Sequence, residues 1–137
     1  MLFASAQEYH VSHYFTISIV DDDASVRQAL GSLVRSLGHD AALYESAEHF
    51  LGAATRHASS VVVTDVQMPG MNGIELQERL RRDGDKVPVI FITAFPEEAL
   101  RRRAMAGSAT CFLAKPFEGD AMIRCIETAL AAAGPGA

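Results

Sequence analysis

The chain has 137 residues, of which 49% are hydrophobic and 21% are charged, and its net charge is -5 at neutral pH. This length suits one domain with its own core, and the composition is that of a soluble globular protein without an apolar run long enough to span a bilayer. The acidic balance argues against direct nucleic-acid binding, and the opening MLFASAQEYH lacks the features of a secretory signal. We therefore expect a cytoplasmic domain that binds neither DNA nor membranes.

Residues 1–14 fit no regular element and are expected to form an N-terminal extension, with the folded domain in residues 15–133 and a short tail in 134–137. Five apolar runs rich in Val, Ile and Phe alternate with helix-length amphipathic segments, a pattern typical of an α/β fold with a parallel sheet covered on both faces. The weak run at 41–44 suits an edge strand. The five runs are FTISIV (15–20), AALY (41–44), SVVVT (60–64), VPVIFIT (87–93) and TCFLA (110–114).

Five helices are predicted between and after these runs from their apolar spacing and their start and stop residues. The first is expected to be capped by Asp23 and to stop at Gly38, and the fourth to begin at Pro96 and stop at Gly107. The other three are predicted after Ser46, over about 74–82 and over about 120–132.

Two local features have plain structural interpretations. Cys111 and Cys125 form neither a CxxC pair nor a metal-ligand set with nearby histidines, so we expect buried, reduced thiols. The basic run at 101–103 is expected to be a solvated helix face, although it would also suit a phosphate site. His10 and His13 are too few to indicate a metal site.

Polar side chains follow the apolar runs where the predicted strands end. They are Asp21, Asp22 and Asp23 after the first run, Asp65 after the third, Thr93 after the fourth and Lys115 after the fifth. Ligands of open parallel sheets bind beyond these strand ends, and clustered carboxylates there favour a hard divalent cation such as Mg²⁺. Neither GxxxxGK[ST] nor GxGxxG occurs, which disfavours nucleotide binding. The pattern therefore predicts phosphoryl chemistry with a donor other than a bound nucleotide.

Four motifs in order resemble the receiver domains of two-component response regulators. They are IVDDDASVR, VVVTDVQMPGMNGIEL, FITA and FLAKPF, and the resemblance covers about residues 16–130. ESAEHFL and FLAKPF look most like the nitrogen-fixation branch of that family, whose receivers often precede a DNA-binding domain. The resemblance implies a flavodoxin-like, doubly wound sheet with strand order 2-1-3-4-5 and five helices.

The resemblance also implies a role for each rim residue. Asp65 would accept a phosphoryl group from a sensor histidine kinase, and Lys115 would contact the phosphoryl oxygens. Asp22, Asp65 and the backbone carbonyl of Gln67 would bind Mg²⁺, with Asp21 acting through a metal-bound water. Thr93 and Phe112 would form the switch that alters a partner-binding face, commonly a homodimer surface. The domain would be no enzyme beyond self-phosphorylation and autodephosphorylation.

Two other functions are compatible with the same acidic rim. A metal-dependent phosphohydrolase could use the same nucleophile, but Gln67 stands where its second carboxylate would act as general acid. A non-phosphorylated interaction module would leave Thr93 as a strand end and Phe112 as plain core. The resemblance to receiver domains also implies that the peptide bond before Pro116 is cis. It further implies that Gln67 and Phe95 flank the path of the water that hydrolyses the acyl phosphate.

Overall fold

The structure, a computed structural model, describes residues 15–133, and the predicted extension and tail, with His10 and His13, lie outside the described residues. Five parallel strands form one sheet in the order β2-β1-β3-β4-β5, which confirms the predicted order. The strands are β1 (Thr16–Val20), β2 (Asp40–Tyr44), β3 (Val61–Asp65), β4 (Val89–Thr93) and β5 (Cys111–Ala114).

The burial of each strand follows the apolar pattern of its sequence. Every residue of β3 and β4 is buried, because helices cover both faces of these central strands. The weaker β2 is an edge strand, as predicted, and exposes Asp40 and Leu43. The short β5 forms the other edge and is only partly buried.

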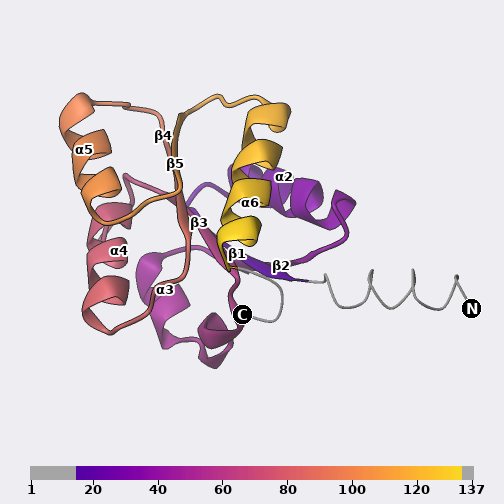
Figure 1. Cartoon of the computed structure of the whole chain (residues 1–137), viewed down its shortest axis with the longest axis horizontal. Helices are drawn as coiled ribbons and strands as arrows, with labels where there is room; N and C mark the ends of the chain where they lie inside the picture. The colour runs from indigo at the N-terminus through magenta and orange to yellow at the C-terminus, as the bar shows by residue number, and fades with distance from the viewer. Residues whose placement is uncertain (1–14, 134–137) are drawn as a thin grey trace, which may run out of the picture.

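Helices cover the sheet in two layers, with α2 and α6 on one side and α3, α4 and α5 on the other (Figure 1). All five predicted helices are present, and an additional 3₁₀ helix, η1, follows α3. Their bounds are α2 (Ala24–Ser36), α3 (Ala47–Gly52), η1 (Ala54–Ala58), α4 (Gly73–Arg82), α5 (Glu98–Ala106) and α6 (Gly119–Ala133).

One helix boundary differs from its prediction. The fourth predicted helix, α5, begins at Glu98 and not at Pro96, because Glu97 keeps an extended backbone as the N-cap residue. Asp23 caps α2 as predicted, since its carboxylate accepts hydrogen bonds from the backbone of Ser25 and Val26. Gly38, at a φ of +91°, takes the chain out of α2 toward β2 in a conformation that side-chain-bearing residues rarely adopt.

Two apolar cores lie on the two faces of the sheet. Phe50, Leu80 and Phe91 belong to the core under α3, α4 and α5. Ile17, Val63 and Ile126 belong to the core under α2 and α6. Because side chains alternate between the faces of a strand, each inner strand contributes to both cores, and the two layers hold the strand ends in fixed register.

The prediction of two reduced thiols is wrong. Cys111 on β5 and Cys125 on α6 form a disulfide, with Cα atoms 6.1 Å apart. The two residues are 14 positions apart, and the packing of α6 against the sheet places them within the Cα separation that a disulfide requires. Within residues 15–133, no helix combines the length and the hydropathy needed to cross a membrane.

Candidate functional site

The polar residues predicted to gather at one rim of the sheet do so. Asp21 follows β1 directly, Asp65 and Thr93 are the last residues of β3 and β4, and Lys115 follows β5. The strands are parallel and hydrogen-bonded in register, so their carboxyl ends meet at this edge. Asp21 and Thr93 are fully buried, whereas Asp65 has 6% exposure.

Lys115 joins the two buried carboxylates. Its Nζ donates to Oδ2 of Asp65 at 3.0 Å and lies 3.1 Å from Oδ2 of Asp21, an ion pair that lacks hydrogen-bond geometry. Partial burial by itself lowers the pKa of Lys115, but the hydrogen bond to Asp65 and the charges of both carboxylates outweigh it, so this pKa is raised. The lysine therefore stays a cation at neutral pH.

The carboxyl group of Asp65 has a raised pKa. Burial raises its pKa, and the negative charge of Asp21 acts in the same direction, against the lowering effects of Lys115 and of the backbone N–H of Gln67. A net rise means that one lysine does not fully compensate the buried charges. The site can therefore be stabilised by a further cation.

The acidic residues fit a metal ion. Asp21, Asp22 and Asp65 each offer one carboxylate oxygen within 4.8 Å of the other two. Oδ2 of Asp21 is buried and has no hydrogen-bond partner among the described residues, so it retains lone pairs for a cation or a metal-bound water. Oxygen donors of this kind suit hard divalent ions. The site thus has the ligand type and spacing for such an ion.

Asp23, by contrast, is not part of the acidic cluster. Its side chain is occupied by the cap of α2, and its backbone N–H donates to Oδ1 of Asp21 at 2.9 Å. The guanidinium of Arg27 donates to the backbone carbonyl of Asp21 at 2.7 Å. The first turn of α2 therefore fixes the orientation of the buried carboxylate.

Thr93 is connected to the loop that follows Asp65. Its hydroxyl donates to Oε1 of Gln67 at 2.6 Å and accepts the backbone N–H of Phe95 at 3.0 Å. The backbone N–H of Lys115 donates to the carbonyl oxygen of Thr93 at 2.7 Å. The ring of Phe95 is 62% exposed. Thr93 is thus a junction between the loops that follow β3, β4 and β5.

Phe112 lies one strand away from Thr93, on β5. Its ring is partly buried against the core under α3, α4 and α5, with its centroid 6.2 Å from that of Phe91. The residues on either side of it, Cys111 and Leu113, pack against the opposite core. The peptide bond between Lys115 and Pro116 is cis, as expected.

The loop between β3 and α4 is held by contacts that the sequence did not predict. Glu48 on α3 accepts the backbone N–H of Met71 at 2.8 Å, and this hydrogen bond lowers the pKa of the glutamate. A Cβ atom on Gly73 would overlap the carbonyl oxygen of Asp65, so only glycine lets α4 begin this close to the acidic residue. No sequence signal links Glu48 to a backbone group 23 positions away.

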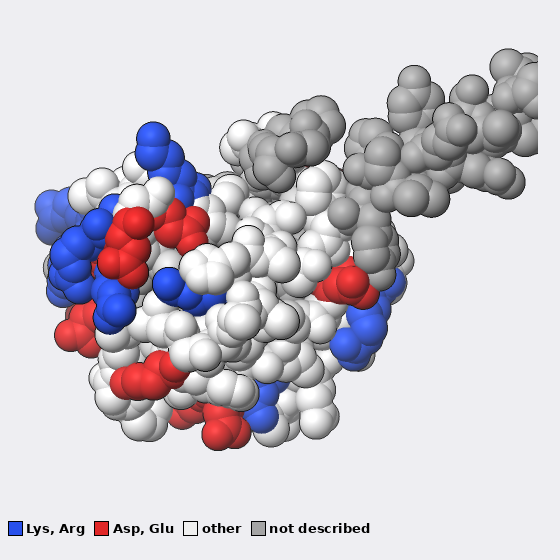
Figure 2. Space-filling view, turned by 90° about the horizontal axis from the view of Figure 1, so that it is seen from below, with Lys and Arg blue, Asp and Glu red and all other residues white. Residues whose placement is uncertain are grey.

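The arginine run is solvated, as predicted. Arg101, Arg102 and Arg103 are exposed on α5, where Arg101 pairs with Glu98 and Arg103 with Glu78 of α4. In Figure 2, basic side chains gather with acidic ones at the left of the molecule, the side on which α4 and α5 lie in Figure 1. Arg101 and Arg103 are thus paired with acidic side chains, so these two arginines do not require a bound phosphate as a partner.

Comparison with known proteins agrees with this geometry. Residues 17–127 match the family described as response regulator receiver domain. Transcriptional regulatory protein FixJ of Bradyrhizobium diazoefficiens is 38% identical over 121 residues, which cover 88% of this chain and 59% of FixJ. Response regulator protein TodT of Pseudomonas putida is 37% identical over 114 residues, which cover 83% of this chain and 50% of TodT.

A solved structure shows the same fold. The response regulator receiver protein from Burkholderia phymatum is 43% identical, with a TM-score of 0.73 and coverage of 85% of this chain and 95% of that one. The chain spans little more than half the length of FixJ and TodT. From its motifs, its strand order and these relatives, the chain belongs to the response regulator receiver domains of two-component systems, in the FixJ-like branch.

Proposed function

We propose that Asp65 is the phosphoacceptor of this receiver domain. The observation that carries the proposal is the environment of its carboxylate, which contacts the ammonium of Lys115 at 3.0 Å and has an oxygen within 4.8 Å of carboxylate oxygens of Asp21 and Asp22. A nucleophile flanked by a fixed cation and by ligands for a second one is suited to phosphoryl transfer, where positioning and charge stabilisation supply most of the catalysis.

The reaction is a single in-line displacement. A carboxylate oxygen of Asp65 attacks the phosphorus of a phosphohistidine on a sensor histidine kinase, the P–N bond breaks, and the imidazole leaves with the bond electrons. The product is an acyl phosphate on Asp65. Water later attacks the phosphorus and releases inorganic phosphate, which restores the carboxylate. The proposed activity is limited to this self-phosphorylation and autodephosphorylation.

The proposal includes Mg²⁺, which would neutralise charge on the transferring phosphoryl group. Asp22, Asp65 and the backbone carbonyl of Gln67 would hold it, with Asp21 binding through a metal-bound water. Lys115 would contact the phosphoryl oxygens. The buried Oδ2 of Asp21, which accepts no hydrogen bond among the described residues, and the raised pKa of Asp65 support a cation at this rim.

The output would pass through Thr93 and Phe112. The Thr93 hydroxyl would exchange its hydrogen bond to Gln67 for one to a phosphoryl oxygen. This exchange would shift the loop after β4, and the ring of Phe112 would turn inward. We define the output face as α5, β5 and α6, the elements around Phe112. Its change would control partner binding, including homodimerisation, in the cytoplasm. Since FixJ is a transcriptional regulatory protein, we propose that the output acts on transcription through another domain or partner and not through DNA binding by this domain.

Incubation of the 137-residue chain with acetyl phosphate and Mg²⁺, followed by intact-mass measurement, tests the proposal. We expect one added phosphoryl group in the wild type, none in Asp65→Asn, and none after removal of Mg²⁺ with a chelator. Glu127→Ala, which removes an exposed carboxylate of α6, is the matched control and should behave as the wild type. Phosphate uptake by Asp65→Asn at the wild-type rate would disprove the assignment.

A further inference from the structure

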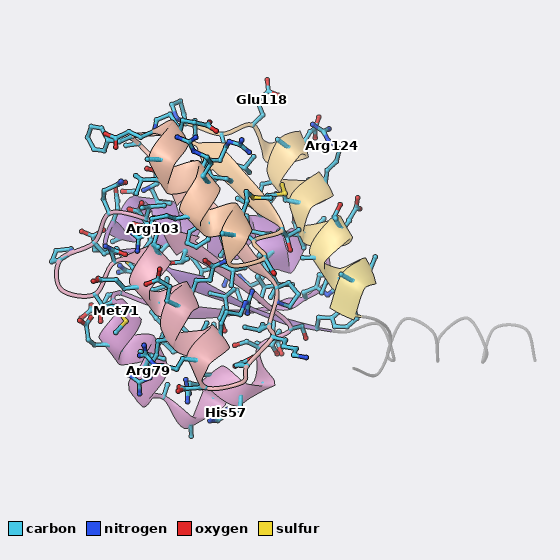
Figure 3. All side chains as sticks on the ribbon, turned by 60° about the vertical axis from the view of Figure 1, so that its left-hand side comes forward. His57, Met71, Arg79, Arg103, Glu118 and Arg124 are labelled. Carbon is cyan, nitrogen blue, oxygen red and sulfur yellow. A yellow bond between two sulfur atoms is a disulfide. The ribbon has the colours of Figure 1, made fainter. Side chains whose placement is uncertain are left out.

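The disulfide between β5 and α6 has no role in the chemistry of the rim. Figure 3 shows it as a yellow bond beside α6. Within the described part of the chain, both cysteines are in this bond. Cys111 is partly exposed, whereas Cys125 has only 7% exposure. The pair thus combines one partly exposed cysteine with a buried partner.

The position of the pair is notable because it lies within the output face. Cys111 precedes Phe112, and the two side chains point to opposite faces of β5. Among the described residues, β5 is an edge strand that pairs with β4 alone, so one side of it has no backbone pairing within the sheet. The disulfide therefore ties a weakly held strand, which carries the proposed switch ring, to the helix that covers it.

We propose that Cys111 and Cys125 form a reversible thiol–disulfide site whose state sets how far the output face can rearrange on phosphorylation. The site itself stands on the geometry of the two cysteines, while its effect on output rests on the proposed function. The co-reactant is a small-molecule disulfide of the glutathione class. In a reducing compartment, disulfides are usually transient and sense redox conditions, which fits a signalling domain.

The exposure of the two residues assigns the order in which their sulfurs react. The thiolate of Cys111 attacks one sulfur of the small disulfide, forms a mixed disulfide and releases one thiolate. The thiolate of Cys125 then attacks the sulfur of Cys111, forms the internal bond and releases the second thiolate. In total, the protein loses two electrons and two protons, and the small disulfide becomes two thiols. Excess thiol reverses both steps.

The bond should restrain output without blocking phosphorylation. A disulfide confines its two Cα atoms to a narrow range of separations, so oxidation limits movement of β5 relative to α6. Lys115 lies four residues beyond Cys111, a distance of roughly 13 Å along an extended strand. The acidic rim is therefore outside the direct reach of the bond, whereas Phe112 is adjacent to it.

The first test counts thiols in the 137-residue chain equilibrated at graded ratios of reduced to oxidised glutathione. Alkylation with iodoacetamide in denaturant and intact-mass measurement should show two free thiols disappearing together, without a stable glutathione adduct. Cys125→Ala should instead accumulate the adduct on Cys111, because the buried partner is missing. Two thiols that stay free in excess oxidised glutathione, or an adduct on the wild type that never resolves, would overturn the site.

The second test follows amide hydrogen exchange by mass spectrometry in oxidised and reduced protein, each with and without acetyl phosphate and Mg²⁺. We expect phosphorylation to change exchange in β5 and α6 of the reduced protein, and the change to be at least threefold smaller when oxidised. The variant with Cys111→Ser and Cys125→Ala should respond equally in both conditions. Equal responses of the wild type in both redox states would overturn the proposal.

The two proposals fail in distinguishable ways. If neither redox state takes up phosphate, the proposed function fails, and comparison of the unphosphorylated states decides the redox site. Slower exchange in β5 and α6 of the oxidised protein would then support the restraint, and identical exchange would refute it.

Discussion

The hydroxyl of Thr93 donates a hydrogen bond of 2.6 Å to the side-chain oxygen of Gln67, two residues after the proposed phosphoacceptor. The same hydroxyl is the group expected to contact a phosphoryl oxygen on Asp65. Gln67 and the proposed phosphoryl group would therefore compete for one donor. In the proposed switch, this hydrogen bond would stabilise the unphosphorylated state and would have to break on phosphorylation.

Gln67→Ala should shift the domain toward its phosphorylated conformation. A neutral hydrogen bond contributes about 1 kcal/mol, which corresponds to about a fivefold change in the equilibrium. Sedimentation with a phosphoryl mimic would measure the shift as stronger self-association. In a Thr93→Ala background, the same Gln67 substitution should have no effect, since the competing donor is absent. An equal effect in both backgrounds would show that Gln67 acts by another route.

Asp65→Asn should stabilise the metal-free fold at neutral pH. Burial raises the pKa of Asp65 in the folded state above that in the unfolded state, so folding favours its protonated form. Its contribution is present below the unfolded pKa and is lost as the pH rises through the folded pKa. Thermal unfolding should show a higher midpoint for Asp65→Asn at pH 7 and a smaller difference near pH 3. A variant that is less stable at pH 7 would contradict the direction of this shift.

Asp22→Ala should weaken Mg²⁺ binding and prevent phosphorylation. It removes one of three carboxylates whose oxygens lie within 4.8 Å of one another, and the only one of the three that is exposed. The chain has no Trp, so titration calorimetry is a better measurement than indole fluorescence. Glu127→Ala serves again as the control with an unchanged affinity. Retention of wild-type affinity in Asp22→Ala would exclude Asp22 as a ligand.

Phe95→Glu should shorten the lifetime of the acyl phosphate. Phe95 is 62% exposed, and its backbone N–H donates to the Thr93 hydroxyl at the rim. An apolar ring there sheds water, whereas a carboxylate can orient the attacking water. We expect phosphate loss to become about tenfold faster, a barrier change of about 1.4 kcal/mol. Normal phosphorylation with unchanged loss would show that Phe95 does not govern the lifetime.

Gly73→Ala should destabilise the fold, with Gly52→Ala as its control. A Cβ atom at Gly73 would meet the carbonyl of Asp65, whereas one at Gly52 has no neighbouring atom within 4 Å. Overpacking of this kind costs about 1–3 kcal/mol, and urea unfolding would measure it. The Gly52 variant should unfold at or slightly above the wild-type midpoint. Equal stability of the two variants would mean that the loop yields without cost.

The strands and the rim were predictable because their signals are local. Continuous apolar runs predict buried strands, and a parallel sheet brings the residues after them to one edge. The contacts that depend on tertiary packing were not predictable, because no short spacing encodes them. Cys111 and Cys125 meet only through the docking of α6, and Gln67 meets Thr93 across 26 positions. The later start of α5, at Glu98, was not predicted because the backbone stays extended through Glu97.

Hydrogen-bonded register makes the rim sensitive to changes in strand length. Deletion of one residue within β3 would turn Asp65 toward the opposite face and remove it from Lys115, whatever the loops did to adapt. Connections at the amino ends of the strands, such as residues 84–88 before β4, carry no such constraint on the acidic cluster. Insertions and deletions among descendants of this chain, natural or engineered, should therefore accumulate in the loops at the amino ends of the strands, while the loops at the rim change by substitution.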